Sequence, residues 1–297
     1  MSVRNLLHAE REANEILKDF KPDLIVGTGG YASYPLVRYG AKAGIPTAVH
    51  ESNIVPGLTT RQLESYCDRI MVGFVDCRAH YKHPQKVVVT GTPVRGEFSR
   101  YTKNGAKAEL GLPLDKPLVV SVWGSLGAGN MNKLMCEFIK LCGTEPAFRL
   151  IHSAGSEGYE SMTETLRSTA PWHERSGMEV REYIYDMPRV MAAADVVMCR
   201  AGASTVSELT YMHKPTIFVP SPYVTDDHQM KNARVIENEG GAIIFTEDDM
   251  TARELYDELT ELLDSHEKLG KMSEAMARLA RPGATDSIVE EILRLAK

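Results

Sequence analysis

The sequence lacks an excess of positive charge. Its 297 residues include 34 lysines and arginines against 40 aspartates and glutamates, which gives a formal net charge of −6 at pH 7. A nucleic-acid-binding domain is usually basic, because it must neutralise backbone phosphates. This balance argues against nucleic acid as a partner of the protein.

The sequence also lacks long apolar runs and paired cysteines. No stretch approaches the roughly 20 apolar residues that cross a bilayer. Residues 1–20 are charged throughout and lack the apolar segment of a signal peptide. The five cysteines are scattered without C-x-x-C spacing, which is typical of reduced thiols rather than of disulfides or a zinc site. We therefore predict a cytoplasmic protein, at most peripherally bound to a membrane.

Short apolar runs alternate with amphipathic segments along the chain. This alternation predicts an α/β protein built from βαβ units with parallel sheets. The predicted strands are 24–26, 47–49, 70–73, 87–90, 118–123, 149–152, 196–198, 216–219 and 242–245. The predicted helices include 131–141, 204–212, 228–239, 252–263 and 285–296. Several strands are continuous apolar runs, as expected where helices cover both faces of a sheet.

A proline- and glycine-rich stretch at 91–117 predicts the boundary between two domains. We expect a partial N-terminal Rossmann-like domain at 1–92 and a C-terminal nucleotide-binding Rossmann-like domain at 93–280. We expect the helix within 281–297 to pack back on the N-terminal domain. The first domain offers about four strands, roughly two to three strand–helix units fewer than a six-stranded doubly wound sheet.

The strongest local motif is the segment 200–208, Arg-Ala-Gly-Ala-Ser-Thr-Val-Ser-Glu, which follows a strand and opens a helix. Its small residues let a ligand approach the backbone, and Ser204 or Thr205 can cap the helix. The first-turn N–H groups and the helix dipole then favour a diphosphate, while Glu208 can accept hydrogen bonds from a ribose diol. The alternative is an ordinary capping box formed by Thr205 and Glu208.

Two glycine-rich turns follow other strands. The first is 123–130, Trp-Gly-Ser-Leu-Gly-Ala-Gly-Asn, which is neither a Walker loop nor a full dinucleotide-binding fingerprint. The second is 27–33, Gly-Thr-Gly-Gly-Tyr-Ala-Ser, which would present Tyr31 and Ser33 at the carboxyl end of a strand. Each is equally compatible with a tight turn that needs glycine for steric reasons.

Two polar loops complete the set of candidates. In 50–57, Glu51 is a candidate general base, and the alternative is a helix cap at Ser52 or Asn53. The segment 223–229 contains three possible metal ligands, Asp226, Asp227 and His228, but no further His, Asp or Glu cluster follows at a spacing suited to a metal site. That loop is better suited to hydrogen-bonding sugar hydroxyls. We expect neither a metal nor another cofactor.

Taken together in order and spacing, these motifs resemble the MurG family of peptidoglycan N-acetylglucosaminyltransferases. The matching segments are 27–31, 50–53, 56–59, 91–95, 124–128, 186–187, 200–208 and 226–229. The resemblance implies a GT-B fold of two Rossmann-like domains, the C-terminal one binding the UDP-sugar and the N-terminal one the acceptor. It implies inverting transfer of N-acetylglucosamine from UDP-GlcNAc to the C4 hydroxyl of undecaprenyl-diphospho-N-acetylmuramoyl-pentapeptide. Such an enzyme acts in peptidoglycan synthesis, as a peripheral protein on the inner face of the cell membrane.

The resemblance also implies roles for individual residues. It assigns donor-substrate binding to Asn53, Arg95, Ser125, Ile184, Ala203, Ser204, Thr205, Val206, Ser207, Glu208 and Gln229. It assigns acceptor binding or catalysis to Tyr31, Glu51 and Asn132. Within the donor set, Ile184 would contact the uracil, Glu208 the ribose and Gln229 the N-acetylglucosamine.

The chain departs from the family pattern in several places, among them the following two. The family's opening strand and Gly-Gly-Thr-Gly-Gly-His loop have no counterpart, and Trp123 stands where the family has glycine. We interpret the chain as a truncated member, with the missing part supplied by a separate chain as one hypothesis. Two alternatives to an active transferase stay open: a non-catalytic UDP-sugar-binding subunit or remnant, and an enzyme similar to UDP-GlcNAc 2-epimerase.

Overall fold

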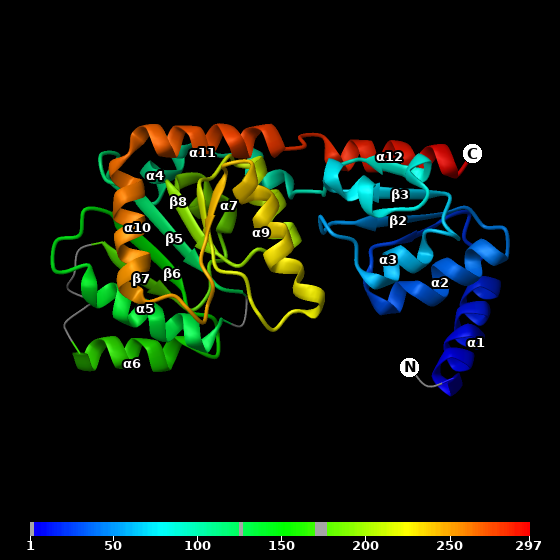
Figure 1. The fold of residues 1–297 in the computed structure, drawn as a ribbon, viewed down its shortest axis with the longest axis horizontal. Coiled ribbons are helices and arrows are strands. Elements are labelled where there is room, and N and C mark those ends of the chain that lie inside the picture. Colours follow the sequence, from blue (N-terminus) through cyan, green and yellow to red (C-terminus); the bar gives the residue numbers. More distant parts are fainter. Residues whose placement is uncertain (1–2, 125–126, 170–176) are drawn as a thin grey trace. The chain divides into compact units, whose positions relative to one another are not determined.

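The computed structural model describes residues 3–124, 127–169 and 177–297, and it divides into two compact units (Figure 1). The first unit is Met1–Val94 together with Arg281–Lys297, and the second is Arg95–Ala280. Each unit is built on its own parallel sheet. Over the described ranges, no helix is both long and apolar enough to span a bilayer.

The first unit contains a four-stranded parallel sheet in the order β1-β2-β3-β4. Its strands are β1 (Ile25–Gly27), β2 (Thr47–Glu51), β3 (Arg69–Val72) and β4 (Val87–Val89), and its helices are α1 (Val3–Phe20), α2 (Gly30–Lys42), α3 (Leu58–Leu63) and α12 (Ala284–Leu295). Val49, Ile70 and Val72 are completely buried, which explains why these strands appear as continuous apolar runs. The core therefore lies between the central strands and their helices.

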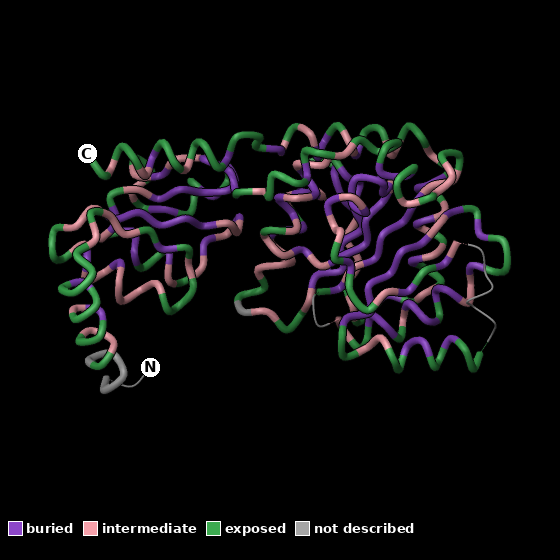
Figure 2. The backbone as a smooth tube through the Cα atoms, turned by 180° about the vertical axis from the view of Figure 1, so that it is seen from behind, coloured by how far each residue is buried: buried purple, intermediate pink, exposed green. Residues whose placement is uncertain are grey.

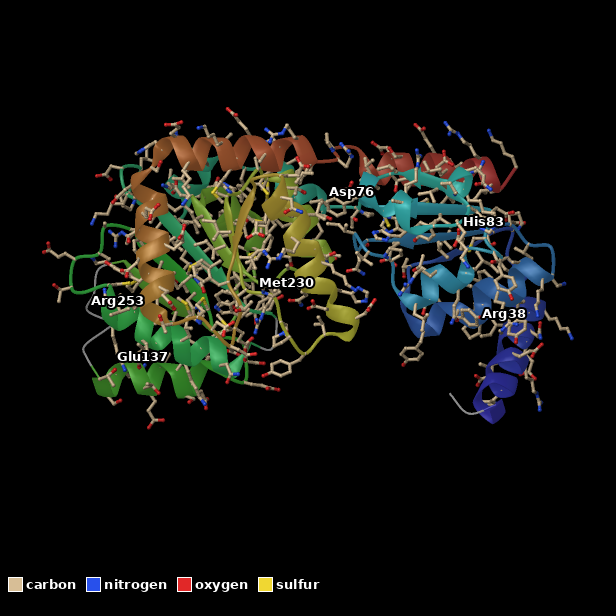
Figure 3. The ribbon with its side chains drawn as sticks, viewed as in Figure 1. Arg38, Asp76, His83, Glu137, Met230 and Arg253 are labelled. Carbon is tan, nitrogen blue, oxygen red and sulfur yellow. The ribbon has the colours of Figure 1, made fainter. Side chains whose placement is uncertain are left out.

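Helix α2 is held partly by its own cationic and aromatic side chains. The Arg38 guanidinium lies 5.6 Å from the ring centroids of Tyr34 and Tyr39 and 5.4 Å from that of Tyr66 (Figure 3). Cation–π contacts of this kind contribute roughly 0.5–1 kcal/mol at exposed sites and more where the groups are desolvated. They help to fix the helix that follows the first glycine-rich turn.

The second unit contains a six-stranded parallel sheet in the order β10-β9-β8-β5-β6-β7. Its strands are β5 (Leu118–Val122), β6 (Arg149–Ser153), β7 (Met178–Arg181), β8 (Val196–Cys199), β9 (Thr216–Phe218) and β10 (Ala242–Ile244). Its helices are α4 (Lys103–Glu109), α5 (Gly129–Leu141), α6 (Tyr159–Thr169), α7 (Met187–Ala193), α8 (Ala203–Tyr211), α9 (His228–Asn238), α10 (Ala252–Asp264) and α11 (His266–Leu279). Figure 2 shows that the buried segments coincide largely with the strands.

The strand order of this second sheet reverses between β5 and β8. From β5 the chain moves outward to β6 and β7, then returns to place β8 on the other side of β5 and continues to β9 and β10. In open parallel sheets, ligands bind outside the carboxyl ends of the strands at such a reversal. The topology therefore marks where a ligand site is expected.

One strand of the second sheet was missed. Strand β7 was not predicted, because it is an edge strand of four residues in which exposed Glu179 interrupts the apolar pattern. The two units divide between Val94 and Arg95, inside the stretch 91–117, and the rest of that stretch, with a 3₁₀ turn at Gly96–Ser99 and helix α4, belongs to the second unit. Phe98, only 1% exposed, anchors that stretch although few other apolar residues flank it.

Candidate functional site

A cavity of about 750 Å³ lies at the carboxyl ends of the strands in the second unit. Its walls include residues that follow β5, β7, β8, β9 and β10. The sequence-predicted residues that line it are Arg95, Ile184, Thr205, Glu208 and Gln229. Its volume falls within the range of small-molecule sites, roughly 300–1,000 Å³. The cavity therefore brings together residues from widely separated parts of the sequence at the reversal of strand order between β5 and β8.

The N-terminus of α8 opens toward this cavity without a side-chain cap. Its N-cap is Gly202, with φ −65° and ψ 145°, and both Gly202 and Thr205 line the cavity. The predicted cap at Ser204 or Thr205, and the alternative capping box with Glu208, are wrong because the helix begins earlier, at Ala203. No side chain caps the first-turn N–H groups, and together with the helix dipole they favour an anion at this end of the helix.

The other predicted residues of this helix differ in exposure. Ser204 is exposed, and Ala203 is half-buried. Val206 is completely buried, and the Ser207 hydroxyl donates a hydrogen bond of 3.0 Å to the Ala203 carbonyl. Val206 and Ser207 therefore support the helix, so that only the first turn is suited to present backbone donors.

Glu208 lies on the second turn of α8, where it faces Arg95. Their closest atoms, Glu208 Oε1 and an Arg95 terminal nitrogen, are 3.8 Å apart, and both residues line the cavity. Burial raises the pKa of the Glu208 carboxyl, and the Arg95 charge opposes that shift. A carboxylate in this position can accept hydrogen bonds from a diol, while the guanidinium is available for an anionic group.

Ile184 lies in the loop between β7 and α7, with its side chain only 2% exposed. The neighbouring rings of Tyr183 and Tyr185 lie 4.9 Å apart between centroids and also line the cavity. Together these three residues form an apolar and aromatic wall. Such a wall suits a planar base, with backbone groups of the loop available for hydrogen bonds.

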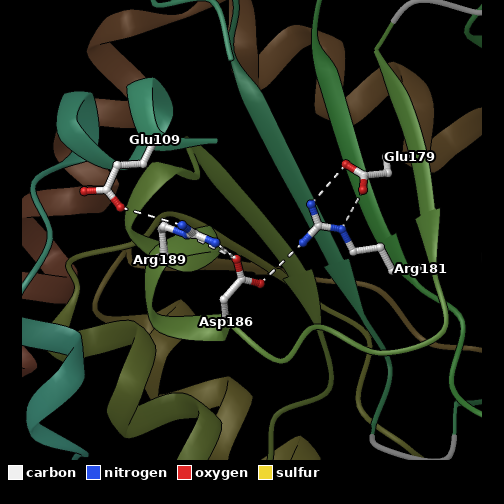
Figure 4. A network of polar contacts seen from close by, with 5 residues as sticks. All are labelled: Glu109, Glu179, Arg181, Asp186 and Arg189. Carbon is white, nitrogen blue, oxygen red and sulfur yellow. Dashed lines mark hydrogen bonds and ion pairs between the residues drawn. The ribbon is translucent and has the colours of Figure 1, made fainter. Parts of the chain in front are cut away.

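A network of charged side chains fixes the ends of this loop (Figure 4). Asp186 accepts a hydrogen bond of 3.1 Å from Arg189 Nε and forms a 3.4 Å ion pair with Arg181. Arg181 also contacts Glu179 at 2.7 Å, and Arg189 contacts Glu109 at 3.7 Å. Burial alone would raise the pKa of Asp186, but the two arginines outweigh it and hold the pKa below its usual value. The carboxylate therefore stays ionised and keeps the loop in place.

Gln229 lies in the first turn of α9 and lines the cavity. Its side-chain oxygen accepts a 2.9 Å hydrogen bond from the Ser221 backbone N–H. This contact fixes the orientation of the amide, so that its nitrogen is available as a donor. Ser125 lies outside the described residues. Among the residues that the structure does describe, no group of three His, Cys, Asp or Glu side chains is arranged to hold a metal.

Glu51 is 5% exposed at the end of β2, and its carboxylate organises the loop that follows. Oε1 accepts hydrogen bonds of 3.0 Å from the backbone and side-chain nitrogens of Asn53. Oε2 accepts bonds of 3.0 Å from the Gly57 backbone and 2.8 Å from the Thr60 hydroxyl. Four bonds occupy the usual acceptor capacity of a carboxylate, which favours a structural role over that of a general base.

The loop around Glu51 also corrects the cap predicted at Ser52 or Asn53. Helix α3 begins at Leu58 with Gly57 as its N-cap, so neither residue caps it. Tyr31, by contrast, is 77% exposed in the first turn of α2. It is therefore free to meet a ligand of the first unit.

Asn132 is buried in the second unit and does not line the cavity. Its side-chain nitrogen donates a 2.8 Å hydrogen bond to the Ala154 carbonyl, and its oxygen lies 3.3 Å from His152 Nε2. The other His152 ring nitrogen lies 3.0 Å from the Ser121 hydroxyl. This chain of contacts joins α5 to β5 and β6, so Asn132 is best explained as a residue that positions the glycine-rich loop before it.

Sequence reasoning missed several residues of the cavity wall. Arg200 lies within the strongest motif, yet its side chain was given no role. Glu247 and Asn130 also line the cavity, together with Trp123. Glu247 belongs to no motif, because only the strand order brings the end of β10 to the same sheet edge as Arg200.

Complete burial of His152 gives a testable dependence of stability on pH. Burial lowers the pKa of His152 from 6.5 to about 3. Between these values the unfolded chain binds the extra proton, so the free energy of unfolding should fall by about 1.4 kcal/mol per pH unit as pH drops below 6.5. From pH 7 to pH 5 we expect the wild type to lose about 2 kcal/mol more than His152→Gln. Urea unfolding at the two pH values measures this, and equal losses would contradict it.

The sequence matches the models of two domains of one protein family. The model for the glycosyltransferase family 28 C-terminal domain matches residues 118–288, and the model for the N-terminal domain of the same family matches residues 2–72. The two matches together span both units of the structure.

Curated relatives match over the whole chain. A UDP-N-acetylglucosamine–N-acetylmuramyl-(pentapeptide) pyrophosphoryl-undecaprenol N-acetylglucosamine transferase of Acetivibrio thermocellus is 39% identical over 297 residues, which is 100% of this chain and 79% of that protein. A protein of the same name from Ruminiclostridium cellulolyticum is 36% identical over 100% of this chain and 80% of its own length.

Solved structures show the same architecture. The crystal structure of Acinetobacter baumannii MurG matches with a TM-score of 0.80 and 28% identity, covering 99% of this chain and 81% of that one. The S. aureus MnaA–UDP co-structure matches with a TM-score of 0.71 and 17% identity, covering 99% and 83% of the two chains. At that identity the second match concerns the fold alone.

Proposed function

This chain belongs to glycosyltransferase family 28, and we propose that it transfers N-acetylglucosamine from UDP-GlcNAc to N-acetylmuramoyl-pentapeptide on undecaprenyl diphosphate. Its predicted GT-B architecture and its resemblance to the MurG family are confirmed by these matches. The observation that carries the proposal for the donor is the uncapped N-terminus of α8 beside Glu208, inside a cavity of about 750 Å³.

We propose a single direction for the donor in this cavity. The loop of Ile184 follows β7 at one edge of the sheet, α8 begins near the centre, and Gln229 follows β9 toward the other edge. We place the uracil against Ile184, the ribose on Glu208, the diphosphate at the first turn of α8 and the sugar near Gln229. Charge develops on the diphosphate as UDP leaves, and the helix-end N–H groups stabilise that charge electrostatically.

The acceptor would be bound by the first unit. Tyr31 lies just beyond the carboxyl end of β1, where an open sheet binds ligands. In an inverting transfer, the acceptor hydroxyl attacks the sugar carbon from the face opposite the departing UDP and gives its proton to a base. The hydrogen bonds of Glu51 favour an indirect role for it, holding Asn53 and the rest of this loop in place.

A transfer assay tests this function directly. The purified chain is incubated with labelled UDP-GlcNAc and a soluble analogue of the lipid-linked acceptor, and the product linkage is determined by NMR. We expect acceptor-dependent formation of a disaccharide with inverted anomeric configuration. Epimer formation without acceptor would favour the 2-epimerase alternative. Tight binding of UDP-GlcNAc without turnover of either kind would favour a non-catalytic subunit.

We also propose that the protein works as a peripheral protein on the inner face of the cell membrane, because the proposed acceptor carries a lipid. Exposed apolar side chains of the first unit support this, with Phe20 78%, Tyr31 77% and Leu58 65% exposed. Sedimentation with vesicles of acidic phospholipid tests the proposal. Recovery of all the protein in the supernatant at low salt would contradict it.

A separate partner chain is a further part of the proposal. Within the described residues, β1 pairs only with β2, and Val26 in β1 is 37% exposed. An unpaired parallel edge of this kind is a template for strand addition, so we propose that additional strands pair there. Light scattering of the wild type and of Val26→Lys, which places a charge on that edge, tests it. If both stay monomeric and no strand-donating protein binds, the edge has no partner.

A further inference from the structure

Three polar side chains meet on the β10 side of the cavity. Arg200 follows β8, Glu247 follows β10, and Asn130 lies at the start of α5. An Arg200 terminal nitrogen lies 2.5 Å from Glu247 Oε2, and the Asn130 side-chain nitrogen donates a 3.1 Å bond to Glu247 Oε1. The side chains of Arg200 and Glu247 are only 12% and 6% exposed. This is a rigid, charged arrangement in the wall of a ligand cavity.

Stability alone is a weak explanation for this arrangement. A buried ion pair loses the hydration of both charges, and apolar residues of similar size often serve stability as well or better. Arg200 is held further by a 2.8 Å hydrogen bond from its other terminal nitrogen to the Val219 carbonyl. Within the described part of the chain, one donor contacts each Glu247 oxygen, which leaves each with acceptor capacity.

Trp123 supplies a second, independent observation in the same wall. It is 2% exposed, lines the cavity, and its ring centroid lies 6.0 Å from the Arg200 guanidinium carbon. Its indole N–H is buried and has no hydrogen-bond partner among the described residues. Buried donors in native structures are almost always paired, so an unpaired one in a residue of the cavity wall makes the ligand of that cavity a candidate partner.

We propose that Glu247 is a specificity-determining residue for the sugar of the donor. It accepts hydrogen bonds from ring hydroxyls of N-acetylglucosamine, while the Trp123 N–H donates to a sugar oxygen. This inference rests on the proposed function, which places the diphosphate at α8 and the nucleoside toward β7. The sugar then lies toward β9 and β10, where hydroxyl donors require a fixed acceptor such as the Glu247 carboxylate.

Calorimetric titration of the full chain with UDP and with UDP-GlcNAc separates this site from the nucleotide site. In Glu247→Gln the shape is kept and the charge is lost. We expect the Kd for UDP-GlcNAc to rise about ten-fold and the Kd for UDP to stay within about two-fold. The matched control is Glu267→Gln, whose side chain is 78% exposed and pairs with Lys271, and which should change neither Kd.

A second variant, Glu247→Asp, separates a loss of sugar binding from a loss of folding. It keeps the negative charge opposite Arg200 but shortens the side chain by one methylene. It should show the same selective loss, with the thermal unfolding midpoint checked for each variant. Equal losses for UDP and UDP-GlcNAc, or no loss in either folded variant, would overturn the inference. If the wild type fails to bind UDP at all, the proposed function itself is wrong, which is a different result.

Discussion

Replacing Glu208 with alanine is expected to raise the Kd for UDP by about 100-fold. The side chain is half-buried at 21% exposure, and in the proposed binding mode its carboxylate accepts two hydrogen bonds from the ribose diol. A hydrogen bond to a charged group contributes roughly 1.5–3 kcal/mol, so the loss of two is a large effect even if they are not additive. Isothermal titration calorimetry of wild type and variant measures it.

A second ligand shows whether the ribose is the group concerned. The wild type should bind 2′,3′-dideoxy-UDP much more weakly than UDP, whereas Glu208→Ala should bind the two alike. Glu208→Ala also releases Arg95, which lies 3.8 Å from the carboxylate and can then move toward the phosphates. The comparison of the two ligands cancels that effect. Undiminished discrimination by the variant would place the ribose elsewhere.

The strand–helix order was largely predictable because the physics that sets it is local. Buried parallel strands need continuous apolar runs, and β5, β8 and β9 have them. Strand β7 was missed because Glu179 faces solvent at a sheet edge, where burial no longer dictates the pattern. Apolar patterning therefore locates the centre of a sheet better than its edges.

The candidate site was predictable to the extent that it depends on one short segment. The strand–glycine–helix pattern of 200–208 correctly indicated that a helix begins there, although it starts at Ala203 and has no side-chain cap. That this helix N-terminus binds an anion stays a prediction. The observed N-cap, Gly202, lies three residues before the Thr205 of the capping box, and this shift leaves the first-turn N–H groups without a side-chain cap. Sequence alone does not fix helix ends that closely.

Residues whose roles depend on distant partners were not predictable. From the sequence, Glu51 is a candidate base, but the structure shows that its carboxylate accepts four hydrogen bonds. Asn132 is likewise a candidate ligand-binding residue in the sequence, but in the structure it is buried in contact with His152. Glu247 carries no signal of its own, because its partner Arg200 is 47 residues away. Such roles arise from the fold, which brings strand ends together irrespective of their separation in sequence.

Stability of the second unit should depend strongly on Asp195, which connects α7 to β8. One carboxylate oxygen accepts a 2.8 Å hydrogen bond from the Leu118 N–H and lies 2.9 Å from Lys107 Nζ, and the other contacts Lys103. The Lys107 side chain is only 3% exposed. Burial alone would raise the pKa of Asp195, but the two lysines and the Leu118 N–H outweigh it and hold the pKa below its usual value.

We therefore expect Asp195→Asn to lower the free energy of unfolding at pH 7 by about 3–5 kcal/mol, because it leaves a buried ammonium group without its counter-charge. Asp195 also stabilises the charge of a second buried lysine, Lys214. The Lys214 Nζ donates hydrogen bonds to the Ala192 and Ala194 carbonyls, and burial lowers its pKa to about 8 although the Asp195 charge opposes that shift. Since the pKa of Asp195 is depressed in the folded state, its contribution is present above the unfolded pKa and is lost as pH falls through the folded value.

Tryptophan fluorescence is suited to the second unit, because both tryptophans of the sequence, Trp123 and Trp172, fall within the range 95–280. Chemical denaturation should show the large loss for Asp195→Asn and a change within about 0.5 kcal/mol for Glu267→Gln, whose pair is exposed. Adding Lys107→Met to Asp195→Asn should recover part of the loss, because the unpaired ammonium is then removed. A loss below about 1 kcal/mol for Asp195→Asn, or no recovery in the double variant, would mean that these charges are solvated rather than mutually dependent.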